Sequence, residues 1–394
     1  MAGLFNVAVA QRPGSREPRQ EKLLNGLRLL MWNDPSAADV KVGIRIHSGS
    51  AFDPQGKEGV MQLLADNIFP TPASRDYFSE ELGGGIQVVT NYDYIQVNAS
   101  ARSADFVKLL ESLAQAISQP TIDKETTDSL KRTLAEKLAS LEKDPVYLAE
   151  RAAAKRLFGT FPYGRPAAGT RESLERIDHA DLLFVKERFL TADNATVAIS
   201  GNFNSDFGYR AARRFFGGWL KSDKRIPATF KQPDDPDTKT LELNADGAIV
   251  RSSFAFRGIA RNDPDYAASR VLERILKGRL QKQASGFSVA SEARMLPGVV
   301  SVSGAGTAVW PPKILTDRIG EAEFNTARAE ALAEFSNRSP VDQWLDADTY
   351  GIKVATETQA FQKITLPDVQ RLADRLARNP VVSVVVRPAA NTAH

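Results

Sequence analysis

Residues 58–69 read EGVMQLLADNIF, and this stretch decides how the first part of the chain is expected to fold. Four apolar side chains in it recur at the spacing of one helix face: Val60, Leu63, Leu64 and Ile68. A short helix is therefore predicted here. Alternating apolar and polar residues, typical of strands, flank the helix at residues 26–32, 40–48, 85–90 and 94–101. Turn residues at 33–35 and 91–93 join the strands of each pair.

Longer helical patterns occupy the next part of the chain, at residues 103–118, 123–142 and 146–158. Pro120 and Pro145 separate them, because proline cannot continue a helix. A helix at 180–189, a strand at 195–200 and a helix at 206–219 follow. This mixture of strands and helices indicates an α+β fold.

Residues 221–246 interrupt the pattern with charged residues, with Pro227, Pro233 and Pro236, and with acidic residues at 234, 235 and 237. Such a composition predicts a linker. The strand and helix pattern then restarts, with elements at 249–258, 266–276, 298–307, within 314–335, and at 340–350, 367–376 and 381–387. The sequence therefore predicts a tail (1–20), a first domain (21–220), a linker (221–246) and a second domain (247–394).

The order of signals in the second domain repeats that in the first. Two pairs of positions carry the echo: Asp53-Pro54 with Asp263-Pro264, and Ile177 and Asp181 before strand 195–200 with Ile364 and Asp368 before strand 381–386. Each echo is weak alone, but their shared order favours a duplication. We therefore expect two similar halves, each a mixed, mostly antiparallel β-sheet covered by helices.

The composition excludes several classes of function. The net charge is only +3 and no basic run is interleaved with aromatic residues, so nucleic acid is not an expected partner. No apolar stretch is long enough to span a bilayer. Cysteine is absent, which excludes disulfides and thiolate chemistry. The three histidines, His47, His179 and His394, lie far apart in sequence, so nitrogen ligands for a metal are scarce.

The first ten residues read MAGLFNVAVA and leave the compartment unknown. Residues 8–10 are small, like the end of a secretory signal, which suggests a truncated export signal and a periplasmic location. The segment is too short for a full signal and lacks a basic start, so a flexible beginning of the chain is an equal alternative.

Seven short stretches give the chain a likeness to a known family, the most specific being PYGRP at residues 162–166. They are GLR at 26–28, SGS at 48–50, the helix at 59–69, LGGG at 82–85, LFG at 157–159 with the PYGRP run, NAT at 194–196, and SG at 200–201. In these residues and in its order of elements, the chain resembles the insulinase or pitrilysin family of inverted zinc peptidases. The resemblance implies their two-domain fold.

In that family the first helix carries the motif His-x-x-Glu-His, whose histidines bind zinc while the glutamate activates water. The matching positions here are Gln62, Ala65 and Asp66. The resemblance places the third ligand near Glu136, beside Lys137. An amide is a poor zinc ligand and alanine cannot accept a proton, so no zinc and no catalysis are expected at these positions. Gln62 and Asp66 are then solvated helix residues, and Ala65 is packing.

The resemblance also suggests substrate contacts. Arg279 and Phe287 fall in the region where the family uses an arginine and a tyrosine, although a surface role for Arg279 is an equal alternative. The strand containing Gln87, Val88, Val89 and Thr90 matches the edge that pairs with a peptide in active relatives. An ordinary or covered edge is the other interpretation.

These observations favour a non-catalytic subunit of a two-chain insulinase-type zinc peptidase. Such a subunit supplies chamber wall and peptide contacts, while a catalytic partner carries the intact His-x-x-Glu-His motif and the zinc; the isolated chain can also form a homodimer. The alternative is a stand-alone structural or peptide-binding protein on the same fold. A third hypothesis, an active peptidase with an unusual site, requires peptidase activity that chelation abolishes.

Overall fold

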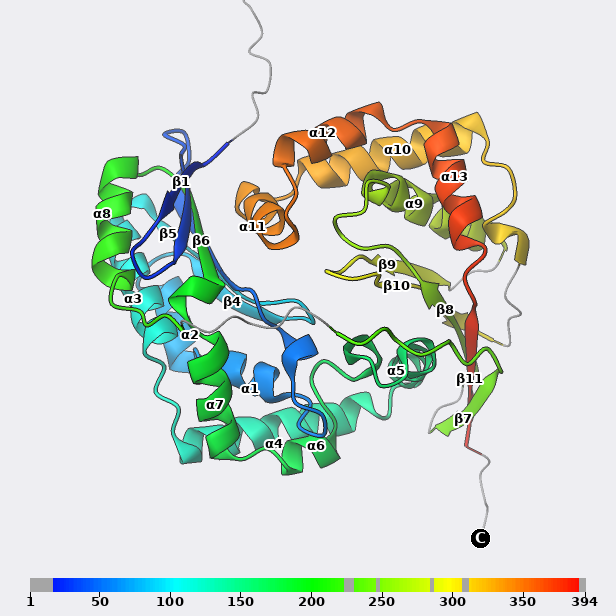
Figure 1. Ribbon diagram of the computed structural model, residues 1–394, viewed down its shortest axis with the longest axis horizontal. Helices are drawn as coiled ribbons and strands as arrows, with labels where there is room; N and C mark the ends of the chain where they lie inside the picture. Colours follow the sequence, from blue (N-terminus) through cyan, green and yellow to red (C-terminus); the bar gives the residue numbers. More distant parts are fainter. Residues whose placement is uncertain (1–16, 223–229, 246–248, 284–286, 307–311, 390–394) are drawn as a thin grey trace, which may run out of the picture.

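The computed structural model describes residues 17–222, 230–245, 249–283, 287–306 and 312–389. The chain folds into two halves, each built on one sheet (Figure 1). The first half contains β1 (Arg19–Lys22), β2 (Arg28–Asn33), β3 (Asp39–Ile46), η1 (Ser50–Phe52), α1 (Val60–Asp66), α2 (Pro72–Glu80), β4 (Gly85–Thr90), β5 (Ile95–Arg102), η2 (Ser103–Asp105), α3 (Phe106–Ser118), α4 (Lys124–Leu141), α5 (Pro145–Phe158), η3 (Pro162–Gly164), α6 (Arg171–Glu175), α7 (His179–Phe189), η4 (Ala192–Asn194), β6 (Ala195–Gly201) and α8 (Ser205–Phe216).

The second half has the same kinds of element in a similar order. It contains β7 (Leu241–Ala245), β8 (Arg251–Arg257), α9 (Tyr266–Gln283), β9 (Ser288–Glu292), β10 (Val299–Ala305), η5 (Pro312–Ile314), α10 (Glu321–Ser336), α11 (Pro340–Tyr350), α12 (Val354–Lys363), α13 (Leu366–Leu376) and β11 (Val382–Pro388). Among the residues that the structure describes, no helix is both long and apolar enough to span a bilayer.

The two sheets confirm the predicted duplication. The first has the order β1-β2-β6-β3-β5-β4 and the second β7-β11-β8-β10-β9. In each sheet one pair is parallel, β2 with β6 and β7 with β11, and the remaining pairs are antiparallel. Omitting β1, the two orders match strand for strand, so β4 and β9 are corresponding edges. The fold is therefore α+β, with two mixed, mostly antiparallel sheets.

The predicted echo before the last strand of each half has a structural basis. Asp181 on α7 and Asp368 on α13 are the third residues of capping boxes that begin these helices. Each accepts the backbone N–H of the residue that caps its helix, at 2.9 and 3.1 Å. The same device therefore begins the helix that leads into β6 and the helix that leads into β11.

Each half also supplies one helix to the other half. On α11 of the second half, Trp344 and Leu345 are buried in a cluster with Leu30 of β2 and Ala198 of β6. In exchange, α5 of the first half lies against β8 and β11 of the second sheet. The inner face of each sheet is thus covered by a helix from the opposite half (Figure 1).

The segment 221–246, which the sequence suggests as a linker, contributes a strand to the second sheet. Within it, Leu241, Leu243 and Ala245 are half-buried and alternate with exposed residues in β7, which pairs with β11. The sequence analysis did not recognise β7 as a strand, because its short apolar alternation lies in a charged, proline-rich segment. Five other elements were not foreseen: β1, α2, α6, β9 and α12.

Candidate functional site

The helix that carries the motif positions, α1, is held by a buried carboxylate at its start. Asp53 accepts the backbone N–H groups of Gly59 and Met61 at 2.7 and 3.0 Å. Burial raises the pKa of Asp53 to about 7, against the lowering effect of these two N–H groups and of Arg165. Gly59 has φ 100°, and a side chain there would collide with the carbonyl oxygen of Ala168, so glycine is required.

The motif positions on α1 form a contact that requires no metal. Gln62 donates its side-chain amide to Asp66 at 3.0 Å, one helical turn away. Between them, Ala65 is completely buried in the core of the first half, so it fills space as a packing residue. Burial raises the pKa of Asp66, and the Gln62 amide and the charges of Arg75 and Lys137 oppose that shift.

The residue next to the position expected for the third zinc ligand places a cation near α1. Glu136 is exposed on α4, whereas the charge of Lys137 is close enough to lower the pKa of Asp66. One carboxylate, one amide and two nearby cations do not fit the donor set that zinc uses in this family. Among the described residues no three His, Asp or Glu side chains are arranged to hold a metal ion.

The side chains of His47 and His179 contact residues outside α1. His47 Nε2 lies 2.9 Å from the Thr196 hydroxyl and 3.3 Å from Asp348 Oδ2. Burial lowers the pKa of His47, although Asp348 acts in the opposite sense. His179 Nε2 lies 2.9 Å from the carbonyl oxygen of Ile122. His394 and residues 1–16, including the suspected export signal, lie outside the described residues.

The two residues suggested as substrate contacts in the second half have packing partners instead. Arg279 makes a two-pronged ion pair with Glu323, with both N···O distances 2.9 Å, and donates to the Ile314 carbonyl at 2.7 Å. The Phe287 ring lies over Gly304, where an added Cβ would approach it to 2.4 Å. Neither residue lines the cavity between the halves, so their action on a substrate stays a prediction without support from these contacts.

The edge strand predicted to bind peptide is at an edge of the first sheet. β4 pairs with β5 and, within the described part of the chain, with no other strand. Gln87 and Val89 are exposed, whereas Val88 packs on the core, so the strand alternates between solvent and interior. At its end, Thr90 borders a cavity, and its buried hydroxyl oxygen has no partner among the described residues.

That cavity lies between the halves and has a volume of about 760 Å³. The first half supplies the turn at residues 90–94 and one side of α5, and the second half supplies residues 290–294 and the end of α11. Tyrosine and arginine side chains are prominent in its lining: Tyr92, Tyr94, Tyr147, Tyr266, Tyr350, Arg151, Arg165, Arg261 and Arg294. The edge strands β4 and β9 therefore both lead to this cavity.

One wall of the cavity is fixed by a buried carboxylate. Asp93 accepts hydrogen bonds from the Tyr163 and Tyr350 hydroxyls at 3.1 and 3.0 Å and from the Met295 N–H at 2.9 Å. The guanidinium of Arg294 lies 4.8 Å from the centre of the Tyr163 ring. The burial of Asp93 raises its pKa. Asp93 thus joins the PYGRP run to two segments of the second half.

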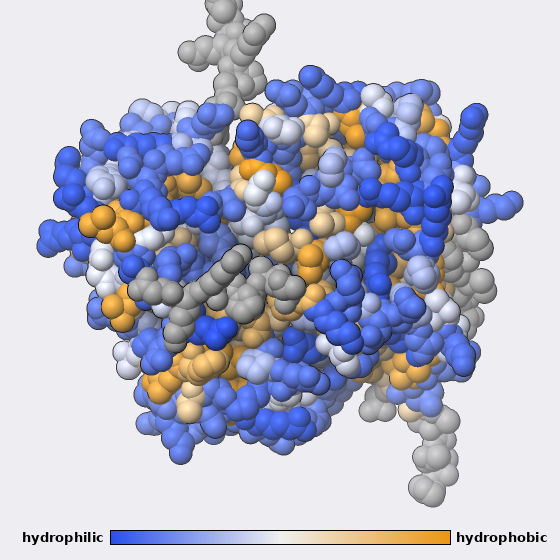
Figure 2. Space-filling model, viewed as in Figure 1, coloured by the Kyte–Doolittle hydropathy of each residue, from blue (hydrophilic) through white to orange (hydrophobic). Residues whose placement is uncertain are grey.

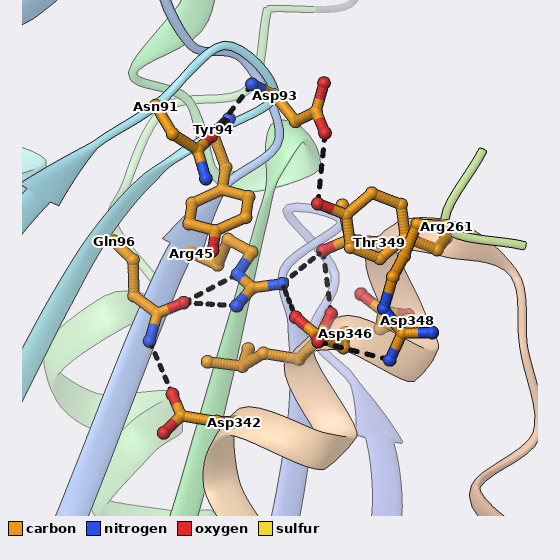
Figure 3. A network of polar contacts seen from close by, with 12 residues as sticks. Arg45, Asn91, Asp93, Tyr94, Gln96, Arg261, Asp342, Asp346, Asp348 and Thr349 are labelled. Atoms are coloured by element: carbon orange, nitrogen blue, oxygen red, sulfur yellow. Dashed lines mark hydrogen bonds and ion pairs between the residues drawn. The ribbon is translucent and has the colours of Figure 1, made fainter. Parts of the chain in front are cut away.

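A chain of buried polar groups continues from this wall beneath α11 (Figure 3). Arg45 on β3 donates to Gln96 at 2.7 Å and to Asp346 on α11 at 2.8 Å. Asp346 also pairs with Arg338 at 2.6 Å and with Arg261 at 3.4 Å. Burial alone would raise the pKa of Asp346, but these three guanidinium groups outweigh it and the pKa is lowered.

The sequence did not single out this network. Residues 91–93 were interpreted only as a turn, and Tyr94 and Arg45 only as parts of strands. Two tyrosines and one aspartate in succession at residues 92–94 were a possible signal of a lined site, but the partner Tyr350 on α11 lies 257 positions from Asp93.

Comparison with known proteins agrees with the fold. Residues 28–171 match the family described as Insulinase (Peptidase family M16), and residues 176–309 match Peptidase M16 inactive domain. The uncharacterized zinc protease YmxG of Bacillus subtilis is 21% identical over 66% of this chain and 64% of its own, so the chain spans less than two thirds of that relative.

Two solved structures have the same architecture. A protease from Helicobacter pylori superposes with a TM-score of 0.86 at 17% identity, covering 94% of this chain and 100% of that chain. A chain of Complex III2 from Candida albicans gives 0.78 at 17% identity, covering 93% and 95%. At such identities the likeness concerns the fold alone. Together, the two family matches and the two-sheet fold establish that this chain belongs to the insulinase family, peptidase family M16.

Proposed function

We propose that this protein is a non-catalytic subunit of an insulinase-type zinc peptidase and that it contributes peptide contacts to a catalytic partner chain. One observation carries the proposal. The fold of the family is kept around α1, while the zinc positions hold Gln62 and Asp66, and the position of the general base holds the buried Ala65. A chain that keeps the family fold but lacks the zinc ligands and the general base is suited to forming part of the wall of a chamber shared with a catalytic chain.

The chemistry of α1 supports the absence of bound zinc. A zinc ion at Gln62 and Asp66 would gain one carboxylate oxygen and a weak amide ligand, and it would face the positive charges of Arg75 and Lys137. A metal recruited from elsewhere would find no proton acceptor at Ala65. A peptidase that acts through this helix is therefore disfavoured.

The open edge of β4 supports contact with peptide. A strand that pairs on one side only can accept an extended peptide on the other through main-chain hydrogen bonds. A peptide that follows β4 to Thr90 arrives at the cavity between the halves, where tyrosine side chains offer flat apolar surface with polar ends. Such a site binds many sequences, because backbone pairing does not depend on side chains.

The alternative is a structural or peptide-binding protein that needs no catalytic partner. The same fold occurs in a chain of Complex III2 from Candida albicans, an assembly that is not named as a protease. The buried network beneath α11 provides a rigid scaffold in either case.

The deciding experiment is affinity purification of the full chain from its native cells, followed by identification of co-purifying chains and by elemental analysis. The proposal predicts a partner whose sequence contains His-x-x-Glu-His, with zinc in the complex and less than about 0.1 zinc per chain in this subunit alone. Recovery of this chain alone, or only of partners without the motif, would support the alternative. About one zinc per isolated chain would overturn both.

A matched variant tests the peptide contact in the same complex. Gln87→Pro removes one backbone N–H from β4, which blocks peptide pairing if that N–H faces the open edge. Val88→Pro removes the next N–H, which points to the opposite edge of the strand. We expect one of the two variants to lose peptide turnover by the complex while assembly is retained. Unchanged turnover in both would show that β4 is an ordinary edge.

A further inference from the structure

A second, separate pocket lies on the first half, outside the cavity between the halves. It has a volume of about 460 Å³ and is formed by α7, residues 51–55 and residues 160–165. Its walls include Phe52, Phe184, Phe189 and Phe230. Figure 2 shows apolar side chains gathered over α7 on this face of the molecule. The pocket thus combines four phenylalanine rings with polar and charged residues, among them Asp53 and Arg188.

Two cations line this pocket, and among the described residues Arg165 pairs with Glu58 at 3.5 Å whereas Arg188 has no anionic partner. The guanidinium of Arg188 lies 6.0 Å from the ring centre of Phe184 and 5.5 Å from that of Phe189. In the described part of the chain no carboxylate lies within ion-pair distance of it, since none of the ion pairs includes Arg188. By contrast, the buried Arg45 and Arg261 both pair with Asp346.

A second guanidinium in the same lining has an unused donor. Arg165 donates from its two terminal nitrogens to the carbonyl oxygens of Asp53 and Ala51, at 3.0 and 3.3 Å. Its Nε is buried and has no acceptor among the described residues. A buried N–H without an acceptor is energetically costly, so an acceptor such as a water or a ligand oxygen is expected there.

The side chain of Phe184, which forms one wall of the pocket, is exposed to solvent. Phe184 is 56% exposed, although a phenylalanine side chain gains free energy when it is buried. It lies on α7 one turn before Arg188, so the ring and the guanidinium are neighbours on the same helix face. An apolar group that enters the pocket would cover Phe184 and place its neighbouring charge near Arg188.

We propose that this pocket binds the C-terminal residue of a peptide, with its carboxylate on Arg188 and its apolar side chain among the phenylalanine rings. A C-terminal residue carries a carboxylate and a side chain on the same carbon atom. When that side chain is apolar, the residue is complementary to the guanidinium of Arg188 and the phenylalanine rings beside it. Arginine holds a carboxylate through charge-assisted hydrogen bonds. The proposal does not rest on a catalytic partner, and it stands or falls separately from the proposed function.

The test uses the full chain and a fluorescent hexapeptide that ends in phenylalanine, in two forms: the free acid and the C-terminal amide. Fluorescence anisotropy should give a dissociation constant on the order of 100 µM for the free acid. The amide should bind about tenfold more weakly, because it carries no charge for Arg188. Equal binding of the two forms would overturn the proposal.

Three variants separate the pocket from general electrostatics. Arg188→Gln should weaken the free acid about tenfold and leave the amide unchanged. Arg213→Gln is the matched control, because Arg213 on α8 lies 5.8 Å from the ring centre of Tyr209 in a similar stacked arrangement. Phe184→Ala removes an exposed side chain without disturbing the core and should weaken both peptides about threefold. If Arg188→Gln and Arg213→Gln have the same effect, the charge is not specific and the proposal is wrong.

Discussion

Arg45 and Asp346 lie 301 positions apart in sequence, yet Arg45 Nη1 donates to Asp346 Oδ1 at 2.8 Å beneath α11. Both side chains are buried, with 2% and 10% of their area exposed. The pair joins β3 of the first half to α11 of the second half. It explains why the two halves form one unit, and it fixes the wall of the cavity that begins at Thr90.

Replacing Asp346 with asparagine should destabilise the chain by about 3–5 kcal/mol, because Arg45, Arg261 and Arg338 would lose their shared anion in a buried site. Chemical denaturation measures this free energy of unfolding. Asp206→Asn is the control, since Asp206 forms a solvent-exposed pair with Arg19 that is expected to contribute little to stability. Similar losses for both variants would show that the buried network adds no stability.

Gly84→Ala should weaken the β4 edge, whereas Gly85→Ala should not. A Cβ at Gly84 would lie 2.0 Å from the Ser100 carbonyl oxygen, and a Cβ at Gly85 would meet nothing within 4 Å. We expect Gly84→Ala to cost more than about 2 kcal/mol of unfolding free energy and to increase hydrogen exchange in β4. For Gly85→Ala we expect a change within about 1 kcal/mol. The two variants are adjacent and chemically identical, so equal effects would contradict the close approach at Gly84.

A chain with the motif restored should bind zinc more tightly when position 137 is also changed. The variant with Gln62→His, Ala65→Glu and Asp66→His supplies two histidines but keeps the cation of Lys137 near the site. Adding Lys137→Glu should tighten zinc binding at least about tenfold, as measured by competition with a chromophoric chelator. Adding Glu136→Gln instead should change little, because Glu136 is not among the charges that shift the pKa of Asp66. If Glu136→Gln abolishes zinc binding, Glu136 occupies the third-ligand position after all.

Asp53 should make stability depend on pH between about 4 and 7. Burial raises its pKa to about 7 in the folded chain, whereas an unfolded aspartate has a pKa of about 3.9. The folded state therefore binds the extra proton in this window, and the stabilisation is complete below about pH 4 and is lost as the pH rises through about 7.

The check is a comparison with Asp53→Asn, which cannot titrate. The difference in unfolding free energy between wild type and variant should shift in favour of the wild type by about 1.4 kcal/mol per pH unit as the pH falls through this window. Other titrating groups cancel in the difference. Parallel pH profiles for the two proteins would mean that Asp53 is ionised throughout.

Most of the secondary structure was predictable because its signals are local. The spacing of Val60, Leu63, Leu64 and Ile68 gave α1, and prolines at 120 and 145 marked helix boundaries that the structure keeps between α3, α4 and α5. β7 was missed because three alternating apolar residues are too few to stand out in a charged segment. β9 is similarly short, with only half-buried residues on one face.

For the candidate site too, the residue identities could be predicted from the sequence, whereas the contacts between helices could not. The identities at positions 62, 65 and 66 are properties of the sequence, and they alone predict that this helix lacks the zinc ligands of its family. That Lys137 rather than Glu136 acts on Asp66 depends on the rotation of α4 against α1, which a sequence does not fix to within one residue.

By itself, then, the sequence determined the family, the duplicated α+β architecture and the loss of the motif, because each depends on residue type, order and short-range spacing. Only the tertiary structure decided that α5 and α11 cross to the opposite sheets, that Asp346 gathers three arginines, and that Arg188 has no carboxylate partner among the described residues. The physical reason is that burial and charge pairing are set by packing between segments hundreds of residues apart, and no local pattern records which partner a buried charge will meet.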